Sequence, residues 1–224
     1  MWMTIDHLPS AMFSESDLQR IRDAVRAAER RTRGEIVPMI VPRSAVYREA
    51  SHRGGLLTAL LTLTIFLTAE VGWGARAVSE FHPWVVMVAV VAAYVIGHYV
   101  GSCPWGIRFL VTDHRMADKV RRRAELAFYE QGLHRTREAT GVLIHLSLLE
   151  RRVQILADRA INEIVSPETW DSIVRTIVDG IRGNRPTDAL CDAIASCGDL
   201  LARHFPPTPG DNPNELPDGV VHER

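Results

Sequence analysis

The sequence is poor in the features that define several protein classes. It has 3 cysteines in 224 residues, too few for the disulfide framework of a small secreted domain. Its 26 Lys and Arg residues nearly balance 27 Asp and Glu residues, so no excess of positive charge favours nucleic acid as a partner. Residues 1–10 include Asp6, His7 and Pro9 and have no continuous apolar core, which excludes a secretory signal there.

Motifs that identify an enzyme by sequence are also missing. The chain has no glycine-rich phosphate loop, no HExxH metal motif, no Cys-x-x-Cys pair and no serine nucleophile elbow. The sequence therefore gives firmer information on architecture and location than on activity.

Two long stretches have almost no charge. Residues 54–69 (GGLLTALLTLTIFLTA) have no charged side chain, and residues 83–107 have His98 as their only ionisable one. A helix needs roughly 20 apolar residues to cross a bilayer. These runs predict two transmembrane helices, over residues 54–75 and 83–103. The alternative, a pair of buried helices in a soluble core, usually keeps a polar stripe, and these runs have none.

The charges that flank the two runs predict an orientation. Positive residues precede the first run and follow the second, whereas the connector between the runs has one arginine and two glutamates. Since positive loops stay on the cytoplasmic side, both termini should be cytoplasmic and the connector should face outward. We therefore expect a multi-pass protein of a bacterial inner membrane, with the lipid bilayer as one partner.

The remaining segments predict a single α/β domain that the membrane hairpin interrupts. Apolar residues repeat at helical spacing before the runs and again in three segments after them, and strand patterns occupy 35–41, 142–149 and 153–157. A lone strand cannot satisfy its backbone groups, so residues 11–50 and 108–205 should pack together. An N-terminal arm (1–10) and a disordered tail (206–224) would complete the chain.

Two details of the strands carry expectations of their own. Pro38 cannot donate a ladder hydrogen bond, so strand 35–41 should lie at a sheet edge or contain a bulge. The two later strands, joined by Glu150-Arg151-Arg152, should form an antiparallel hairpin. His145 would lie on the face opposite Ile144, as a structural histidine or as a general base.

Several segments resemble the TPM family, which is named for a thylakoid lumen protein, a photosystem II repair protein and an acetylcholine-receptor modulator. They are SESDLQRIRDAVRAAERRTRGEIVPMIV, ATGVLIHLSLLERRVQILADRAINEIVSPETWDSIV and the final LLARHFP. The resemblance covers roughly residues 14–50 and 125–205, and it points to the bacterial branch whose domain contains a membrane hairpin. It implies an α/β sandwich with a small central sheet between helices. Some plant members are described as acid phosphatases, and others act as assembly factors.

The best candidates for phosphatase chemistry are charged residues at strand ends. Asp158 and Arg159 follow the second strand of the hairpin, and Glu35 begins the first strand. Asp158 and Glu35 could gather around a divalent cation such as calcium or magnesium, with Arg159 holding a phosphate. Alternatively, Asp158 caps the segment that follows, and the charged turn at Glu150 is simply solvated.

Two functions are compatible with these features. The first is an accessory or assembly module for a membrane complex, with a membrane protein or a second copy of the chain as its partner. The second is a membrane-bound phosphatase. A transporter is disfavoured because two spans without an acidic pair or a broken helix offer no substrate pathway.

Overall fold

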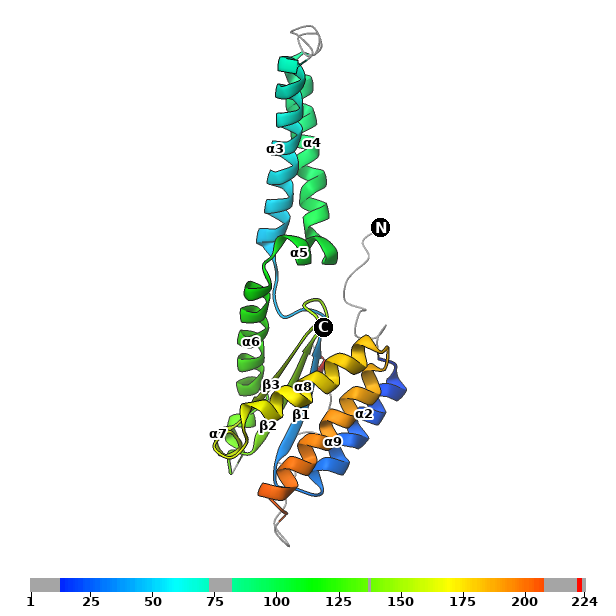
Figure 1. The fold of residues 1–224 in the computed structure, drawn as a ribbon, viewed down its shortest axis with the longest axis vertical. Coiled ribbons are helices and arrows are strands. Elements are labelled where there is room, and N and C mark those ends of the chain that lie inside the picture. The colour runs from blue at the N-terminus through cyan, green and yellow to red at the C-terminus, as the bar shows by residue number, and fades with distance from the viewer. Residues whose placement is uncertain (1–12, 73–81, 137, 208–220, 223–224) are drawn as a thin grey trace. The chain divides into compact units, whose positions relative to one another are not determined.

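The computed structural model describes residues 13–72, 82–136, 138–207 and 221–222. The described residues fall into two compact units (Figure 1), and each is considered by itself. The first contains residues of 1–45 and 117–224, and the second contains residues of 46–116. The first unit is thus assembled from two separate stretches of the sequence.

The first unit contains a sheet of four strands in the order β3-β2-β1-β4. The strands are β1 (Glu35–Val41), β2 (Gly141–Ser147), β3 (Arg152–Ala157) and β4 (Val221–His222). β1 pairs in parallel with both β2 and β4, and β2 pairs antiparallel with β3. The expected hairpin is therefore confirmed, with four residues, Leu148 to Arg151, in its turn.

β1 differs from the expectation that Pro38 places it at a sheet edge. It lies between β2 and β4, and Pro38 is in register with Ile144 of β2. The described part of β4 is two residues long and pairs with Met39 and Ile40. Among the described residues, no strand pairs with Pro38 on the β4 side, so the proline does not interrupt the part of the β1–β4 ladder that is described.

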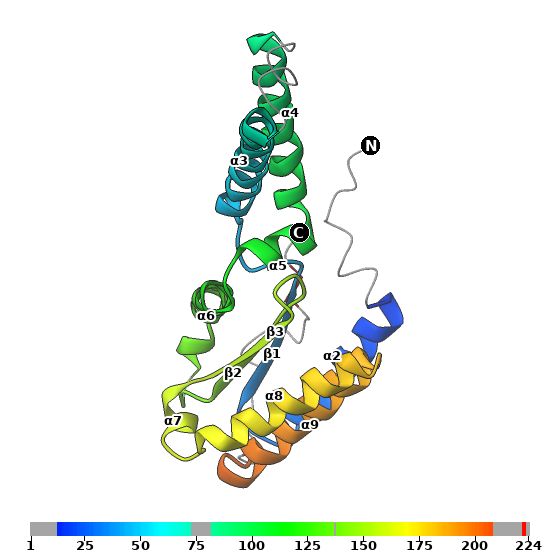
Figure 2. The same cartoon turned by 45° about the horizontal axis from the view of Figure 1, so that its top comes forward.

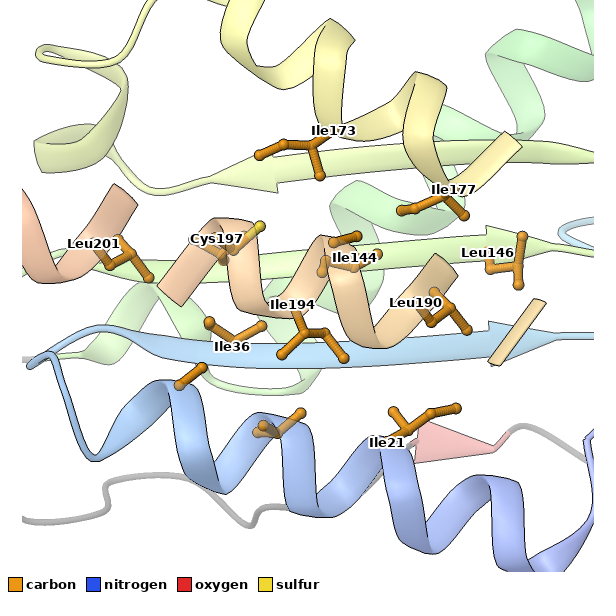
Figure 3. Close-up of a cluster of buried hydrophobic side chains, with 14 of the residues drawn as sticks. Ile21, Ile36, Ile144, Leu146, Ile173, Ile177, Leu190, Ile194, Cys197 and Leu201 are labelled. Carbon is orange, nitrogen blue, oxygen red and sulfur yellow. The ribbon is translucent and has the colours of Figure 1, made fainter. Parts of the chain in front are cut away.

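Helices cover both faces of the sheet, as the fold class requires (Figure 2). The helices of the first unit are α2 (Glu15–Glu29), α6 (Asp113–Glu130) from Ala117 onward, the 3-10 turn η2 (Leu133–Arg135), α7 (Arg159–Asn162), α8 (Pro167–Arg182) and α9 (Pro186–His204). Side chains of α2, α8 and α9 pack with Ile36, Ile144 and Leu146 in the larger core cluster (Figure 3). Residues Ala124, Ala127 and Phe128 of α6 cover the opposite face. The protein is therefore an α/β fold with a small central sheet between helices.

Local sequence explains where several of these helices begin. Ser14 forms a capping box with Asp17, in which each side chain bonds the other residue's backbone N–H. Pro167 occupies the first turn of α8, where its missing N–H costs nothing. After α6, Gly132 takes a φ of 74°, a left-handed conformation that favours glycine.

The C-terminal region contains one element that composition did not suggest. Val221 and His222 form β4, within the segment where disorder is expected. Most of the tail predicted to be disordered, residues 208–220 and 223–224, lies outside the described residues.

The second unit is dominated by two long helices, α3 (Arg48–Gly72) and α4 (Pro83–Ser102), followed by the short α5 (Pro104–Leu110). α3 begins six residues before the apolar run, because the helix continues through the polar Arg48–Arg53 segment. α4 matches its expected bounds within one residue. Both helices are long and apolar enough to cross a membrane, and the most apolar window of each is 11% buried.

Candidate functional site

The predicted acidic residues lie at one end of the sheet. Glu35 begins β1 in register with Gly141, and the Asp158 N–H donates to the Gly141 carbonyl oxygen at 2.9 Å. The two acids therefore flank the first residue of β2 from opposite sides. Their Cα atoms are separated by two interstrand spacings, about 10 Å.

Asp158 is the N-cap of α7, which is the structural alternative that the sequence left open. Its Oδ1 accepts a hydrogen bond from the Arg159 N–H at 2.6 Å. Its Oδ2 is buried and has no hydrogen-bond partner among the described residues. One carboxylate oxygen is thus used for capping, and the other is the acceptor that a catalytic or metal-binding role would employ.

The other two predicted residues differ in exposure. The Glu35 side chain is buried, whereas that of Arg159 is exposed and lies 3.8 Å from Glu163. Within the described part of the chain, no group of three or more His, Cys, Asp or Glu side chains is arranged to hold a metal ion. The catalytic role of Asp158, Arg159 and Glu35, and cation binding by Asp158 and Glu35, remain predictions.

A second polar cluster lies toward the opposite end of the sheet, near the carboxyl ends of the parallel strands β1 and β2. It consists of Ser44, His145, Ser147 and Glu150. Ser44 Oγ donates to Ser147 Oγ at 2.7 Å, and Ser147 Oγ donates to Glu150 Oε2 at 2.5 Å. Glu150 Oε1 accepts from the Ser44 N–H at 3.0 Å. The chain of bonds ties the loop after β1 to the β2–β3 turn.

The hydrogen bonds of this cluster show which ring nitrogen of His145 carries a proton. Its Nε2 lies 3.1 Å from Ser44 Oγ, and its Nδ1 is buried without a partner among the described residues. A hydroxyl has one proton, which Ser44 gives to Ser147, so Ser44 accepts from a protonated Nε2. His145 is consequently a hydrogen-bond donor in this network and not the base that activates Ser44.

Burial has a strong effect on the titration of His145, which is fully buried. Burial, and secondarily the positive charge of Arg123, lower the pKa of His145 from 6.5 to about 4. The imidazole is therefore neutral at physiological pH, in agreement with its single donated hydrogen bond.

The lowered pKa predicts acid sensitivity. Between pH 6.5 and 4 the unfolded chain binds a proton at His145 that the folded chain does not, so stability falls as pH falls through this window. The free energy of unfolding lost in this way by pH 4 is about 3 kcal/mol. Thermal denaturation of the detergent-solubilised chain should show His145→Gln gaining stability relative to the unmodified protein between pH 7.5 and pH 4. A constant difference between the two proteins across that range would contradict the assignment.

Sequence reasoning missed most of this cluster. Glu150 is only 5% exposed, so the expectation of a solvated turn is wrong at that residue. Two bonds, to the Ser44 N–H and the Ser147 hydroxyl, compensate its burial. The sequence does show a serine near the end of each of two strands. Their proximity can be inferred only once those strands are known to be parallel neighbours.

The comparisons with known proteins agree with this fold. The family model described as TPM domain matches residues 104–200. The NMR structure of the BA42 protein from the psychrophilic bacterium Bizionia argentinensis is similar, with a TM-score of 0.57 and 19% sequence identity. The similarity covers 94% of this chain and 95% of that one. At this identity the likeness concerns the fold alone. No curated protein is significantly similar in sequence.

Proposed function

Because the chain carries a domain of the TPM family, we propose that it is an integral membrane protein whose TPM domain serves as an accessory or assembly module for a membrane complex. The proposal places it in a bacterial inner membrane, with two spans and both termini in the cytoplasm. Its partners are the lipid bilayer and a membrane protein or a second copy of the chain.

The exposure of apolar side chains on α3 and α4 carries the membrane part of the proposal. Leu61 is 61% exposed and Ile96 is 62% exposed, and large apolar side chains are exposed along both helices. In water, a contiguous apolar surface of this kind would promote association, whereas lipid tails cover it without cost.

Flanking charges support the orientation. Arg48 and Arg53 lie in the first turns of α3, and Arg108 lies in the last turn of α5. α6 then carries Lys119 and the run Arg121-Arg122-Arg123. Positive residues next to the start of α3 and the end of α4 favour a cytoplasmic position for these two helix ends.

The accessory role rests on the nature of the polar cluster. His145 is a neutral donor, and Glu150 is consumed by bonds that hold two loops together, so neither side chain is poised for acid–base chemistry. The cluster therefore stabilises the domain, which favours the accessory role over an enzymatic one at this end of the sheet.

A membrane-bound phosphatase is the second candidate, and the unpartnered Asp158 Oδ2, at the same end of the sheet as buried Glu35, is the observation that favours it. The purified full-length protein in detergent should be assayed for phosphate-ester hydrolysis across pH and with calcium or magnesium. The accessory proposal predicts no turnover above background and a stable co-purifying membrane partner. Robust turnover that Asp158→Asn abolishes, while Asp171→Asn on exposed α8 does not, would replace the accessory role with the enzymatic one.

A further inference from the structure

The outer edge of β3 is open. β3 pairs with β2 on one side, and in the described part of the chain no strand pairs with its other side. Every residue of β1 and β2 is buried, whereas all six residues of β3 are half-buried. An exposed strand edge offers backbone donors and acceptors to another extended chain.

The hydrogen-bond pattern identifies the groups that point outward. The Asp158 N–H bonds the Gly141 carbonyl oxygen, which fixes the alternation of the ladder: Arg152, Gln154 and Leu156 bond to β2. The backbone groups of Val153, Ile155 and Ala157 therefore face away from the sheet.

Side chains already cover two of the outward carbonyl groups. Gln154 Nε2 donates to the Ile155 carbonyl oxygen at 3.3 Å, and Asn162 Nδ2 donates to that of Ala157 at 2.6 Å. No hydrogen bond from any described residue reaches the N–H or C=O of Val153, or the N–H of Ile155. The free part of the edge is centred on Val153.

A half-open cavity of about 200 Å³ lies at this position. Its walls are formed by α6, by the β2–β3 turn with β3, and by α8, through Ala117, Val120, Arg151, Arg152, Val153, Gln154, Val174 and Val178. We call this set the β3 edge groove. Small-molecule sites usually measure about 300–1,000 Å³, so this cavity is suited to a single aliphatic side chain.

Charge indicates the kind of chain that would fit. Arg151 is exposed, lies in the turn with a φ of 51°, and has no ion pair among the described residues. A carboxylate on an added strand would meet this guanidinium. A second copy paired through Val153 would instead bring the exposed Arg151 side chains of both copies to the same edge, where like charges repel.

We propose that the β3 edge groove binds an extended, acidic peptide segment of a partner protein by strand addition. One aliphatic side chain of that segment enters the cavity beside Val153, and a carboxylate pairs with Arg151. The inference deepens and rests on the proposed accessory role, for which it supplies the contact with the partner. Membrane integration and peptide binding are measured separately, so either can fail alone.

The test uses the full-length protein in detergent and fluorescein-labelled heptapeptides. The panel alternates threonine and valine, with leucine, isoleucine or valine at the centre and aspartate or glutamate at either end. Each peptide that binds is also made in two N-methylated versions. One version has methyl groups on the backbone nitrogens of the odd-numbered residues, and the other has them on those of the even-numbered residues. Fluorescence anisotropy should show that one set weakens binding at least about tenfold while the other has little effect, because only one set faces β3.

Protein variants locate the binding. Val178→Glu places a charge in the cavity and should weaken binding about tenfold or more, and Arg151→Gln should weaken it several-fold. Arg203→Gln, at an exposed position of α9, is the matched control and should leave binding unchanged.

Three outcomes would overturn the proposal. They are no binding by any peptide of the panel at millimolar concentration, equal effects of both N-methylated sets, and a dimer of the unliganded chain that Val178→Glu dissociates. The last result would assign the edge to a second copy. Normal membrane fractionation of Val178→Glu would show that the membrane part of the proposed function is unaffected.

Discussion

Leu61→Arg combined with Val91→Arg is expected to abolish stable membrane integration. Both side chains lie in the middle of the apolar helices, and they are 61% and 58% exposed. In a bilayer, each arginine at the centre of a helix costs about 2.5–3.5 kcal/mol on insertion scales. On the exposed surface of a water-soluble hairpin, the same change would stay within about 0.5 kcal/mol.

The measurement is the fraction of the protein that resists extraction from membranes by alkaline carbonate. Leu126→Arg is the matched control, because Leu126 is a leucine of similar exposure, 53%, on α6. The unmodified protein and Leu126→Arg should stay with the membrane, and the double variant should leave it. If the double variant stays in the membrane fraction, or the unmodified protein is soluble without detergent, α3 and α4 do not span the bilayer.

Cysteine labelling in cells that express the protein tests the orientation. With the native cysteines replaced by alanine, a cysteine introduced at His82, at the start of α4, should react with a membrane-impermeant maleimide added outside. A cysteine introduced at Ser172, an exposed position of α8, should react only after the cells are opened. Labelling of Ser172→Cys in intact cells would reverse the proposed topology.

Gly97→Val is expected to break the close packing of α3 against α4. A Cβ atom at Gly97 would lie 2.4 Å from the Gly54 carbonyl oxygen and 2.0 Å from Thr58 Oγ1. Thr58 Oγ1 also donates to the Ala93 carbonyl oxygen at 2.7 Å, so the helices are held by a hydrogen bond at the point of contact. Small residues permit such an approach between apolar helices. Forcing in a larger side chain typically costs about 1–3 kcal/mol.

The effect can be read from the mole fraction of SDS that unfolds the solubilised protein, followed by tryptophan fluorescence. Ala92→Val is the control, since Ala92 is an exposed residue that precedes Gly97 on the same helix, α4. Gly97→Val should unfold at a clearly lower SDS fraction than Ala92→Val. Equal midpoints would mean that α3 and α4 do not meet at this glycine.

Local signals predicted much of the fold. Helix starts at Ser14 and Pro167, and the reversal between β2 and β3, depend on residues within a few positions of one another. The apolar helices follow from run length and composition, which are also local properties. Even so, the start of α3 at Arg48 was missed, because the length of an apolar run marks the part of a helix that can lie in a bilayer and not the polar turns that precede it.

The candidate site was harder to predict, because its residues are brought together by pairing between distant strands. The sequence indicated that Asp158 and Glu35 lie at strand ends, but their placement on either side of Gly141 depends on the β3-β2-β1 order. Likewise, Ser44 and Ser147 become neighbours only because β1 and β2 are parallel and in register.

The sequence by itself therefore determined most of the elements of this protein and the two apolar segments, since periodicity, caps and run length act over short distances along the chain. Only the tertiary structure decided which strand became central, which acidic side chain was buried and which strand edge stayed open. Pro38 lies in an inner strand, where the described residues of β4 pair with Met39 and Ile40 and not with the proline. Glu150 is buried where Ser44 and Ser147 bond it. The backbone N–H and C=O of Val153 face outward because alternate residues of β3 bond to β2. Each of these features depends on hydrogen bonds between residues of different strands and loops, and neither composition nor local pattern shows which residues pair.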